Sequence, residues 1–262
     1  MSTYKVVAIN GSLSPKDDNI SVIINMLRAN LLNKGVEIEE ILLSEHDIRY
    51  CYNCALCLSN GKCWINDDYR FIMKKTLAAD AVITASTEMY SNGTARIKNF
   101  VDRALSSGHR IKDCSKPGIT LTISKGGKGI SSLTSSLANS LRLFNCYFLT
   151  SFSSISFAQG KFFDKEIVEA KAEDVAQLLL KALTGGRPRS PALDIDRAHW
   201  SFMGYLIKSQ KELMKDDVKH WQELELFDSF ENYVKQKKSK VETNLSEQKK
   251  RLIHLKQIYK NS

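Results

Sequence analysis

Short apolar runs alternate with segments of helical periodicity over the first 185 residues. The runs predict β-strands at Lys5–Asn10, Val36–Leu43, Ala81–Ser86, Gly118–Ser124 and Cys146–Ile155. Apolar positions that recur every three to four residues predict helices at Asn19–Asn33, Asp67–Leu77, Thr94–Ser106, Ile130–Phe144 and Lys165–Leu183. Asp67 and Asp68 stand where they can cap the second helix. This alternation predicts a doubly wound α/β domain over 1–185, with a five-stranded parallel sheet in three layers.

The composition of the chain changes around residue 184. Thr184–Pro191 (TGGRPRSP) holds two of the four prolines, and we expect a linker over 186–193. In 194–262 apolar residues recur at helical spacing, with a last helix predicted around Leu252, Leu255 and Tyr259. This C-terminal extension is therefore expected to be helical and amphipathic. Its apolar face needs a surface to cover, on its own core domain or on a second subunit.

Composition and charge narrow the class of protein. Hydrophobic residues make up 43% and charged residues 26%, which is typical of a soluble globular chain. The sequence has no apolar stretch of membrane-spanning length and no N-terminal signal peptide, so we expect a cytoplasmic protein that does not enter a membrane. The net charge of +9 is spread along the chain, whereas a nucleic-acid binder usually carries a dense basic stripe. We therefore expect no nucleic-acid partner.

Four of the six cysteines, Cys51, Cys54, Cys57 and Cys63, fall within 13 residues. In a chain without a secretory signal, such a cluster points to metal or redox chemistry. Two steps of three residues let three thiolates converge, and a turn at Asn60-Gly61 can return the fourth. This spacing favours a 4Fe–4S cluster. Zinc is less favoured, because a structural zinc site usually has a longer spacer between two Cys pairs, which is missing here. Zinc, and free or disulfide-forming thiols, remain as alternatives.

Polar loops follow three of the predicted strands. Ligands of open parallel sheets bind outside the carboxyl ends of the strands, so these loops are candidate binding segments. Each also has a plain structural interpretation, as a tight turn, a helix cap or a loop with a packed tyrosine. The first loop, with the helix start after it, has hydroxyls and amides suited to a phosphate; the second has an aromatic residue and a glycine; the third is rich in glycine. The three segments are Gly11–Ser14 with Asn19–Ser21, Thr87–Gly93 and Ser124–Gly129.

These segments together resemble the NAD(P)H-dependent FMN reductase family of flavodoxin-like proteins, and more narrowly its iron–sulfur flavoprotein branch. The resemblance covers about residues 1–185 and rests on four segments in the family's order. They are AINGSLSPKDDNIS, CYNCALCLSNGKCWINDD, STEMYSNGTARIKNFVDR and the glycine-rich loop after the fourth strand. The chain departs from the family pattern at Ser14, which replaces an Arg, at Thr87, which replaces a Pro, and at Met89, which replaces a Tyr.

The resemblance implies FMN at the carboxyl edge of the sheet, and homodimers or homotetramers in which flavin and cluster approach one another. It implies that the FMN phosphate is held by Ser12, Ser14, Asn19 and Ser21. It implies that the isoalloxazine ring is lined by Met89, Tyr90, Ser91, Asn92 and Gly93, with Ser124, Gly126 and Gly127 on the other side. The cysteines Cys51, Cys54, Cys57 and Cys63 would hold the cluster.

The function expected from the sequence is therefore that of a redox flavoprotein, an FMN-dependent oxidoreductase that moves electrons between FMN and a 4Fe–4S cluster. No side chain need act as an acid or base in the electron transfer itself. NAD(P)H or a ferredoxin is expected as the redox partner. One alternative is a cluster-free NAD(P)H-dependent reductase of quinones, azo or nitro compounds. The other is a non-enzymatic interaction protein that is stabilised by a bound metal and docks on its partner through the helical extension.

Overall fold

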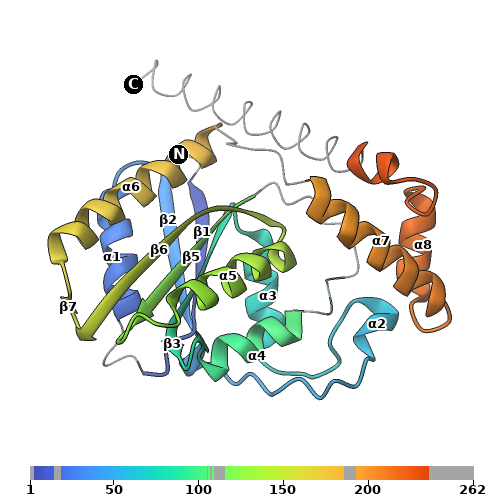
Figure 1. Ribbon diagram of the computed structural model, residues 1–262, viewed down its shortest axis with the longest axis horizontal. Helices are drawn as coiled ribbons and strands as arrows, with labels where there is room; N and C mark the ends of the chain where they lie inside the picture. Colours follow the sequence, from blue (N-terminus) through green and yellow to red (C-terminus); the bar gives the residue numbers. More distant parts are fainter. Residues whose placement is uncertain are drawn as a thin grey trace.

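Five strands of the chain form a parallel sheet in the order β2-β1-β3-β5-β6 (Figure 1). The computed structural model describes residues 3–14, 19–104, 106, 108, 116–185 and 193–235. Its strands are β1 (Tyr4–Asn10), β2 (Val36–Leu42), β3 (Ala81–Met89), β4 (Asn92–Gly93), β5 (Lys116–Ser124), β6 (Cys146–Ala158) and β7 (Lys161–Phe162). The sequence predicted the five parallel strands, while β4 and β7 are two-residue antiparallel additions to β3 and β6.

The helices are α1 (Asn19–Asn30), α2 (Cys57–Asn60), α3 (Tyr69–Ala78), α4 (Ala95–Ala104), α5 (Ile130–Ser140), α6 (Lys165–Thr184), α7 (Leu193–Ser209) and α8 (Lys215–Glu223), with 3-10 helices η2 (Leu43–Glu45) and η4 (Leu141–Phe144). Helices α1 to α5 lie between strands of the sheet, and α6, α7 and α8 follow β7. The first and fourth predicted helices are too long, because α1 ends at Asn30 and α5 passes into η4 after Ser140. The left-handed backbone of Asn145 (φ 62°) ends η4.

The sheet divides the domain into two cores because its side chains alternate between the two faces. Val6 and Ala8 of β1 pack in the core beneath α1 and α6. Val7 and Ile9 point to the opposite face, where α3, α4 and α5 lie. Figure 1 shows these two groups of helices on either side of the sheet. The strands are thus buried on both faces, as expected of a doubly wound sheet.

The third predicted strand is longer than its apolar run and ends in a hairpin. β3 continues to Met89, and β4 pairs back on it with Glu88 opposite Gly93 and Met89 opposite Asn92. The predicted polar loop Thr87–Gly93 is therefore a tight β-hairpin. Hydrogen bonds between the end of β3 and the short strand β4 explain why polar residues extend β3 beyond the apolar core.

The C-terminal extension has a hydrophobic core of its own. Met203 and Ile207 of α7 pack with Trp221 of α8 and with Phe230 further along the chain. Leu58 of α2 packs against this cluster, and α2 and α8 are in contact (Figure 1). The apolar face of the extension thus covers part of the segment that carries the cysteines. Residues 186–192 of the predicted linker and the last helix predicted around Leu252, Leu255 and Tyr259 lie outside the described residues.

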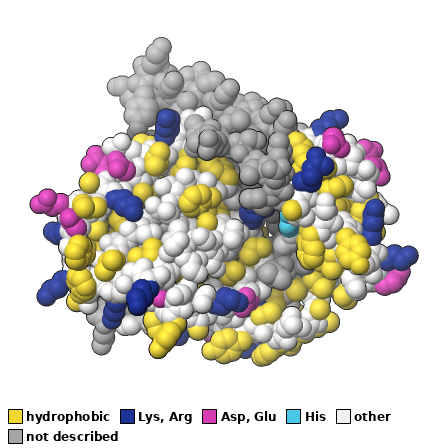
Figure 2. Space-filling model, in the orientation of Figure 1, with side chains coloured by type: hydrophobic (Ala, Val, Ile, Leu, Met, Phe, Trp, Pro, Cys, Tyr) yellow, Lys and Arg dark blue, Asp and Glu magenta, His cyan; other side chains and the backbone are white. Residues whose placement is uncertain are grey.

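The surface bears out the charge pattern of the sequence. Figure 2 shows Lys and Arg side chains scattered over the face viewed, not gathered in one stripe. On the same face, hydrophobic side chains gather toward the lower right, over the region of α8 and α2 in Figure 1. No helix among the described residues is both long and apolar enough to cross a membrane.

Candidate functional site

The loops that follow β1, β3 and β5 meet at the carboxyl edge of the sheet. We call residues 11–14, 88–93 and 124–129 the flavin edge, after the cofactor that the sequence analysis predicts there. The N–H of Gly11 donates to the carbonyl of Ala85 at 2.9 Å, and the Thr94 hydroxyl donates to the carbonyl of Gly11 at 2.5 Å. A Cβ at Gly11 would lie 2.6 Å from Cβ of Ile97. A glycine is therefore required where the first loop lies against α4.

Tyr90 and Ser91 form the turn of the β3–β4 hairpin. Both have left-handed backbones, with φ of 49° and 64°. Two positive φ values are typical of a type I′ turn, whose usual residues are Asn and Gly. A tyrosine and a serine in these positions cost conformational energy. The Tyr90 side chain is 98% exposed, so its packing does not offset this cost.

Glu88 joins the second loop to the third. Its carboxylate accepts hydrogen bonds from the Ser91 N–H at 2.5 Å and from the Ser124 hydroxyl at 2.9 Å. The Ser124 oxygen in turn accepts from the N–H groups of Gly126 and Gly127 at 3.2 and 2.8 Å. The two loops predicted to lie on opposite sides of a flavin ring are therefore neighbours, fastened by a carboxylate that was not among the predicted site residues.

The four predicted phosphate residues have different surroundings. Ser12 is buried and its N–H donates to the Asn10 side chain at 2.9 Å, while Ser14 is exposed. The Asn19 amide donates to the Ser156 hydroxyl at 2.6 Å and accepts from the Gly160 N–H at 2.6 Å. These bonds tie the start of α1 to the β6–β7 hairpin. Asn19 thus has a structural role that its position in the sequence did not reveal.

Ser21 also has a partner within the protein. Its hydroxyl donates to the Glu40 carboxylate at 2.6 Å, and the Asn10 amide donates to the same oxygen at 2.8 Å. Glu40 belongs to β2, next to β1 in the sheet. The structure therefore links Ser21 with Asn10 and Glu40, two residues that the sequence analysis did not single out. Asn10 stands at the start of the first motif segment and Glu40 in none, and the pairing of β1 with β2 brings them together.

The cysteine loop (residues 51–63) is an irregular segment with one short helix. Asn53 and Ala55 have left-handed backbones with φ of 49° and 59°. Gly61 (φ 69°) ends α2 and donates its N–H to the carbonyl of Cys57 at 2.8 Å. The chain therefore turns at Asn60-Gly61, as the sequence predicted. Left-handed alanine is uncommon, and such residues cluster at ligand sites.

The cysteine thiols in this loop differ in environment. Cys51 and Cys54 are exposed, and Cys63 packs against the core beneath α3 and α4. Hydrogen bonds from the Leu56 N–H and the Trp64 indole lower the pKa of the Cys54 thiol. Burial and the nearby negative charge of Cys63 raise the pKa of Cys57.

The donor chemistry of the loop fits a thiolate-bound metal or cluster, because all four cysteines are free thiols on one short segment. Their side chains are not gathered as a ligand set. Within the described ranges, no group of three or more His, Cys, Asp or Glu is placed to hold a metal ion. The number and type of donors are thus present, while the convergence expected from the spacing is not seen.

A buried ion pair holds both stems of the cysteine loop. The Arg103 guanidinium on α4 donates to the two carboxylate oxygens of Asp67 at 2.8 and 3.0 Å, and neither side chain is exposed. Arg103 also donates to the carbonyl of Arg49 at 2.7 Å. Asn99, one turn earlier on α4, donates to the carbonyl of Ile48 at 2.9 Å. Residues before Cys51 and after Cys63 are therefore clamped to one face of α4.

The predicted capping role of Asp67 and Asp68 is only partly correct. Asp67 accepts from the Tyr69 N–H at 3.2 Å at the start of α3, but its main partner is Arg103. Asp68 occupies the N-cap position without a side-chain bond to the helix, and accepts instead from the Asp47 N–H at 2.9 Å. Although burial raises the pKa of the Asp67 carboxyl, bonds from Arg103 and from the Arg49 N–H hold it below its usual value.

Helix α4 connects the two candidate sites. Thr94, just before it, contacts the first loop of the flavin edge, and Arg103 near its end holds the cysteine loop. Ten helical residues span about 15 Å. The segment STEMYSNGTARIKNFVDR therefore contributes to both sites. In the sequence, Asp67 and Arg103 stand near the ends of two separate motif segments. Nothing in the sequence indicates that the two side chains pair.

Comparison with known proteins agrees with this architecture. An iron-sulfur flavoprotein of Archaeoglobus fulgidus is 29% identical over 219 residues, covering 84% of this chain and 98% of that protein. An iron-sulfur flavoprotein of Methanocaldococcus jannaschii is 30% identical over 125 residues, covering 47% of this chain and 64% of that protein.

A solved structure shares the fold. RosB, crystallised with the intermediate 8-demethyl-8-formylriboflavin-5'-phosphate, superimposes with a TM-score of 0.52 at 13% identity, covering 68% of this chain and 76% of that one. At this identity the likeness concerns the fold alone. Residues 4–160 match the family model described as NADPH-dependent FMN reductase, and this match spans more than half of the chain. The chain therefore belongs to the NADPH-dependent FMN reductase family.

Proposed function

We propose that this protein is a redox flavoprotein that binds FMN at the flavin edge and a 4Fe–4S cluster on the cysteine loop. The observation that carries the flavin part is the mutual fastening of the three loops after β1, β3 and β5. Gly11 is tied to Ala85, and Glu88 is tied to Ser124. Family membership makes the protein an FMN-dependent oxidoreductase, and NAD(P)H is the redox partner that this family indicates.

The FMN contacts follow the sequence prediction. The phosphate would lie by the first loop and the start of α1, and the ring between the β3–β4 hairpin and the glycine-rich loop. The contacting residues are proposed to be Ser12, Ser14, Asn19, Ser21, Met89, Tyr90, Ser91, Asn92, Gly93, Ser124, Gly126 and Gly127. Asn19, Ser21 and Ser124 already have partners within the protein, so phosphate or ring contacts there would add to these bonds or replace them.

The cluster would be held by Cys51, Cys54, Cys57 and Cys63. A bound cluster supplies one-electron transfer, and FMN exchanges electrons singly or in pairs. Support comes from the four free thiols, from the left-handed backbones at Asn53 and Ala55, and from the relatives named iron-sulfur flavoprotein. The protein's own part is to position the loop, through the Asp67–Arg103 clamp, and to close it with Trp64 against Cys54.

A second candidate function is that of a cluster-free reductase with the same flavin. The observation that favours it is the separation of the cysteine side chains, which are not gathered as metal ligands among the described residues. In this case the cysteines would be redox or structural thiols. The proposal that the protein is cytoplasmic fits both candidates, since free thiols persist in a reducing compartment. Assembly as a homodimer or homotetramer, and use of a ferredoxin, also remain proposals.

The decisive experiment is purification without oxygen, followed by an absorption spectrum and assays for flavin, iron and sulfide. We expect FMN together with about four iron and four sulfide per chain, as for one cubane cluster. A protein with FMN but without iron would refute the cluster and favour the reductase. A protein without FMN after incubation with the flavin would refute the whole proposal.

A matched pair of variants assigns the ligands. Cys54→Ser removes an exposed thiol of the cysteine loop, and Cys146→Ala removes a buried thiol of β6. Iron and sulfide should fall sharply in Cys54→Ser and stay unchanged in Cys146→Ala, while FMN content stays unchanged in both. Equal loss of iron in the two variants would mean that the cysteine loop is not the cluster site.

A further inference from the structure

The carboxylate of Glu40, on β2, lies beside the end of β1, where the first loop of the flavin edge begins. One of its oxygens accepts hydrogen bonds from the Asn10 amide at 2.8 Å and from the Ser21 hydroxyl at 2.6 Å. The Asn10 amide also donates to the Ser21 hydroxyl at 3.3 Å. Arg28 of α1 lies 3.5 Å from the other carboxylate oxygen. Asn10, Ser21 and Glu40 thus form a closed ring of hydrogen bonds, which we call the Glu40 network.

The carboxylate determines the direction of the bonds in this network, because an ionised carboxylate can only accept. The NH2 group of Asn10 has to face Glu40, so the amide oxygen is left to accept the N–H of Ser12, at 2.9 Å. Ser21 gives its one hydroxyl proton to Glu40. Glu40 therefore acts on the first loop through Asn10, by holding the amide in the orientation that fastens Ser12.

The start of the first loop is fixed by contacts within the protein. The N–H of Gly11 donates to the carbonyl of Ala85, and the next N–H, that of Ser12, donates to Asn10. Both N–H groups are used in this way, so a phosphate at this loop would be met by side chains and by later N–H groups. A loop whose start is already ordered loses less conformational freedom when it binds a ligand.

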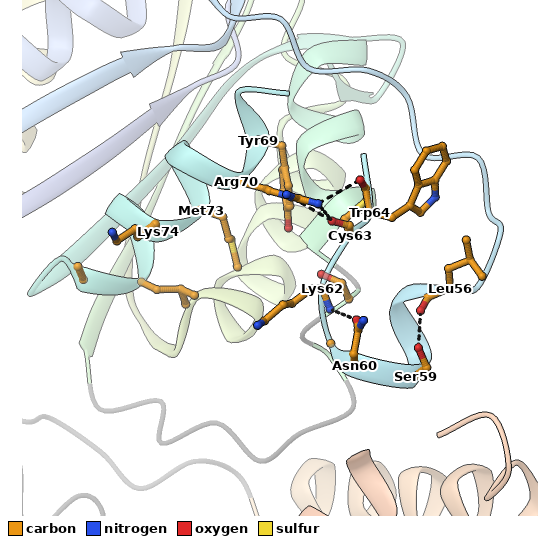
Figure 3. A pocket seen from close by; sticks show the side chains of 14 residues that line it. Leu56, Ser59, Asn60, Lys62, Cys63, Trp64, Tyr69, Arg70, Met73 and Lys74 are labelled. Atoms are coloured by element: carbon orange, nitrogen blue, oxygen red, sulfur yellow. Dashed lines mark hydrogen bonds between the residues drawn. The ribbon is translucent and has the colours of Figure 1, made fainter. Parts of the chain in front are cut away.

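The charge of Glu40 is the opposite of the charge that attracts a phosphate. In the cysteine loop, the backbone is held by a cation, since Arg70 donates to the carbonyls of Cys63 at 2.9 Å and Trp64 at 3.0 Å (Figure 3). At the first loop the holding group is an anion, which repels a phosphate, although Arg28 offsets part of its charge. Glu40 is therefore unsuited to contact the phosphate itself, and its bonds indicate a positioning role.

We propose that Glu40 is a positioning residue for the FMN phosphate and contributes to the preference of the flavin edge for FMN over riboflavin. Its carboxylate orients Asn10, Asn10 fastens Ser12, and the loop then meets the phosphate in one arrangement. This inference rests on the proposed function, because it requires FMN at the flavin edge. Riboflavin has the same ring without the phosphate, so its binding should depend little on the Glu40 network.

The first test measures the Kd of the full-length protein, freed of flavin, for FMN and for riboflavin by fluorescence titration. Glu40→Met removes the acceptor and should weaken FMN binding about tenfold, while the Kd for riboflavin stays within about twofold. Glu37→Met removes the same charge from an exposed position on the same strand and should change neither Kd. Equal weakening of both flavins in Glu40→Met, or equal effects of the two variants, would overturn the proposal.

A conservative variant separates geometry from charge. Both Asn10 and Ser21 donate to the same oxygen of Glu40, so Glu40→Gln keeps an acceptor there and removes only the charge. We expect Glu40→Gln to bind FMN within about threefold of the native protein, which makes it the rescue of Glu40→Met. If both variants instead bind FMN more tightly than the native protein, the charge of Glu40 and not its positioning of Asn10 governs binding, and the proposal is overturned.

A further readout requires no flavin. In Glu40→Met, the Ser12 amide should exchange its hydrogen about tenfold faster, because Asn10 no longer has a fixed orientation. The Gly11 amide, bonded to Ala85, is the internal control and should keep its rate. Unchanged exchange at Ser12 would show that Glu40 does not act through Asn10.

A double-mutant cycle tests the same link in FMN binding. In the background of Asn10→Ala, Glu40→Met should change the Kd for FMN by less than about twofold, because the residue through which Glu40 acts is already absent. Additive effects of the two substitutions would overturn the proposal. A native protein that binds neither flavin would refute the proposed function together with this inference. Native FMN binding that Glu40→Met leaves unchanged would overturn this inference alone.

Discussion

The flavin edge and the cysteine loop are stabilised in different ways. The flavin edge lies where three adjacent parallel strands end, so the sheet itself brings its loops together, and hydrogen bonds such as Gly11 to Ala85 and Ser124 to Glu88 complete it. The cysteine loop has no strand partner. It depends on a buried ion pair, Asp67 with Arg103, between segments 36 residues apart, and on hydrogen bonds from Arg103 and Asn99 to the stem before Cys51. The site on the strand ends is thus held by contacts between its own loops, and the cysteine loop mainly by contacts from α4.

The largest effect on stability is expected from removal of the Asp67–Arg103 ion pair, which clamps the cysteine loop. Asp67→Ala leaves the Arg103 guanidinium buried without its carboxylate, which typically costs about 3–5 kcal/mol. We expect the free energy of unfolding in urea to fall by this amount and iron content to fall with it. The control is Asp102→Ala on the same helix, which removes an exposed pair with Lys98 and should cost less than about 1 kcal/mol. Similar losses in the two variants would contradict the clamp.

A second variant disrupts the packing of the flavin edge and leaves the Asp67–Arg103 ion pair unchanged. A Cβ at Gly129 would lie 2.4 Å from Cα of Ser91 and 2.5 Å from the Glu88 carboxylate, so Gly129→Ala must displace the hairpin. We expect a loss of about 1–3 kcal/mol in stability and a clear rise in the Kd for FMN, followed by flavin fluorescence. Gly126→Ala is the control for stability, since its Cβ would meet no protein atom within 4 Å. Unchanged FMN affinity in Gly129→Ala would show that this packing does not shape the flavin site.

A smaller effect concerns strain in the hairpin turn. Asparagine adopts the left-handed conformation of Tyr90 more readily than tyrosine does, so Tyr90→Asn should raise the free energy of unfolding without flavin by about 1 kcal/mol. The same change should weaken FMN binding if the exposed Tyr90 ring lines the flavin. Ser14→Ala, at an exposed position of another loop, is the comparison for stability. A stabilised variant with unchanged FMN affinity would remove Tyr90 from the flavin site.

The smallest expected effect is a change in pH dependence. The pKa of the Asp67 carboxyl is lowered in the folded state, so its contribution to stability is present above the unfolded pKa of about 4 and is lost as pH falls through the folded value. Between about pH 5 and pH 3, the urea midpoint of Asp67→Asn should therefore fall less steeply than that of the native protein. Asp102→Asn should follow the native slope. Parallel slopes for Asp67→Asn would show that this carboxylate does not titrate with folding.

The amino-acid sequence by itself determined the five parallel strands and the helices that join them. A strand that is buried on both faces of the sheet needs apolar residues at most of its positions. Each such strand can therefore be recognised in the sequence as a short apolar run. The turn at Asn60-Gly61 was predictable for the same local reason, since glycine accepts a positive φ. Element ends were less accurate, because backbone pairing extended β3 to Met89 beyond its apolar run.

Only the tertiary structure decided how the sites are assembled. Asn19 was predicted as a phosphate residue and is bonded to the β6–β7 hairpin, while Glu88 joins two loops without having been predicted. Asp67 was predicted as a helix cap and proved to be half of a buried ion pair with Arg103. The physical reason is common to all three. A polar side chain has several possible partners, and its choice among them depends on which distant segments the folded sheet brings within hydrogen-bond distance.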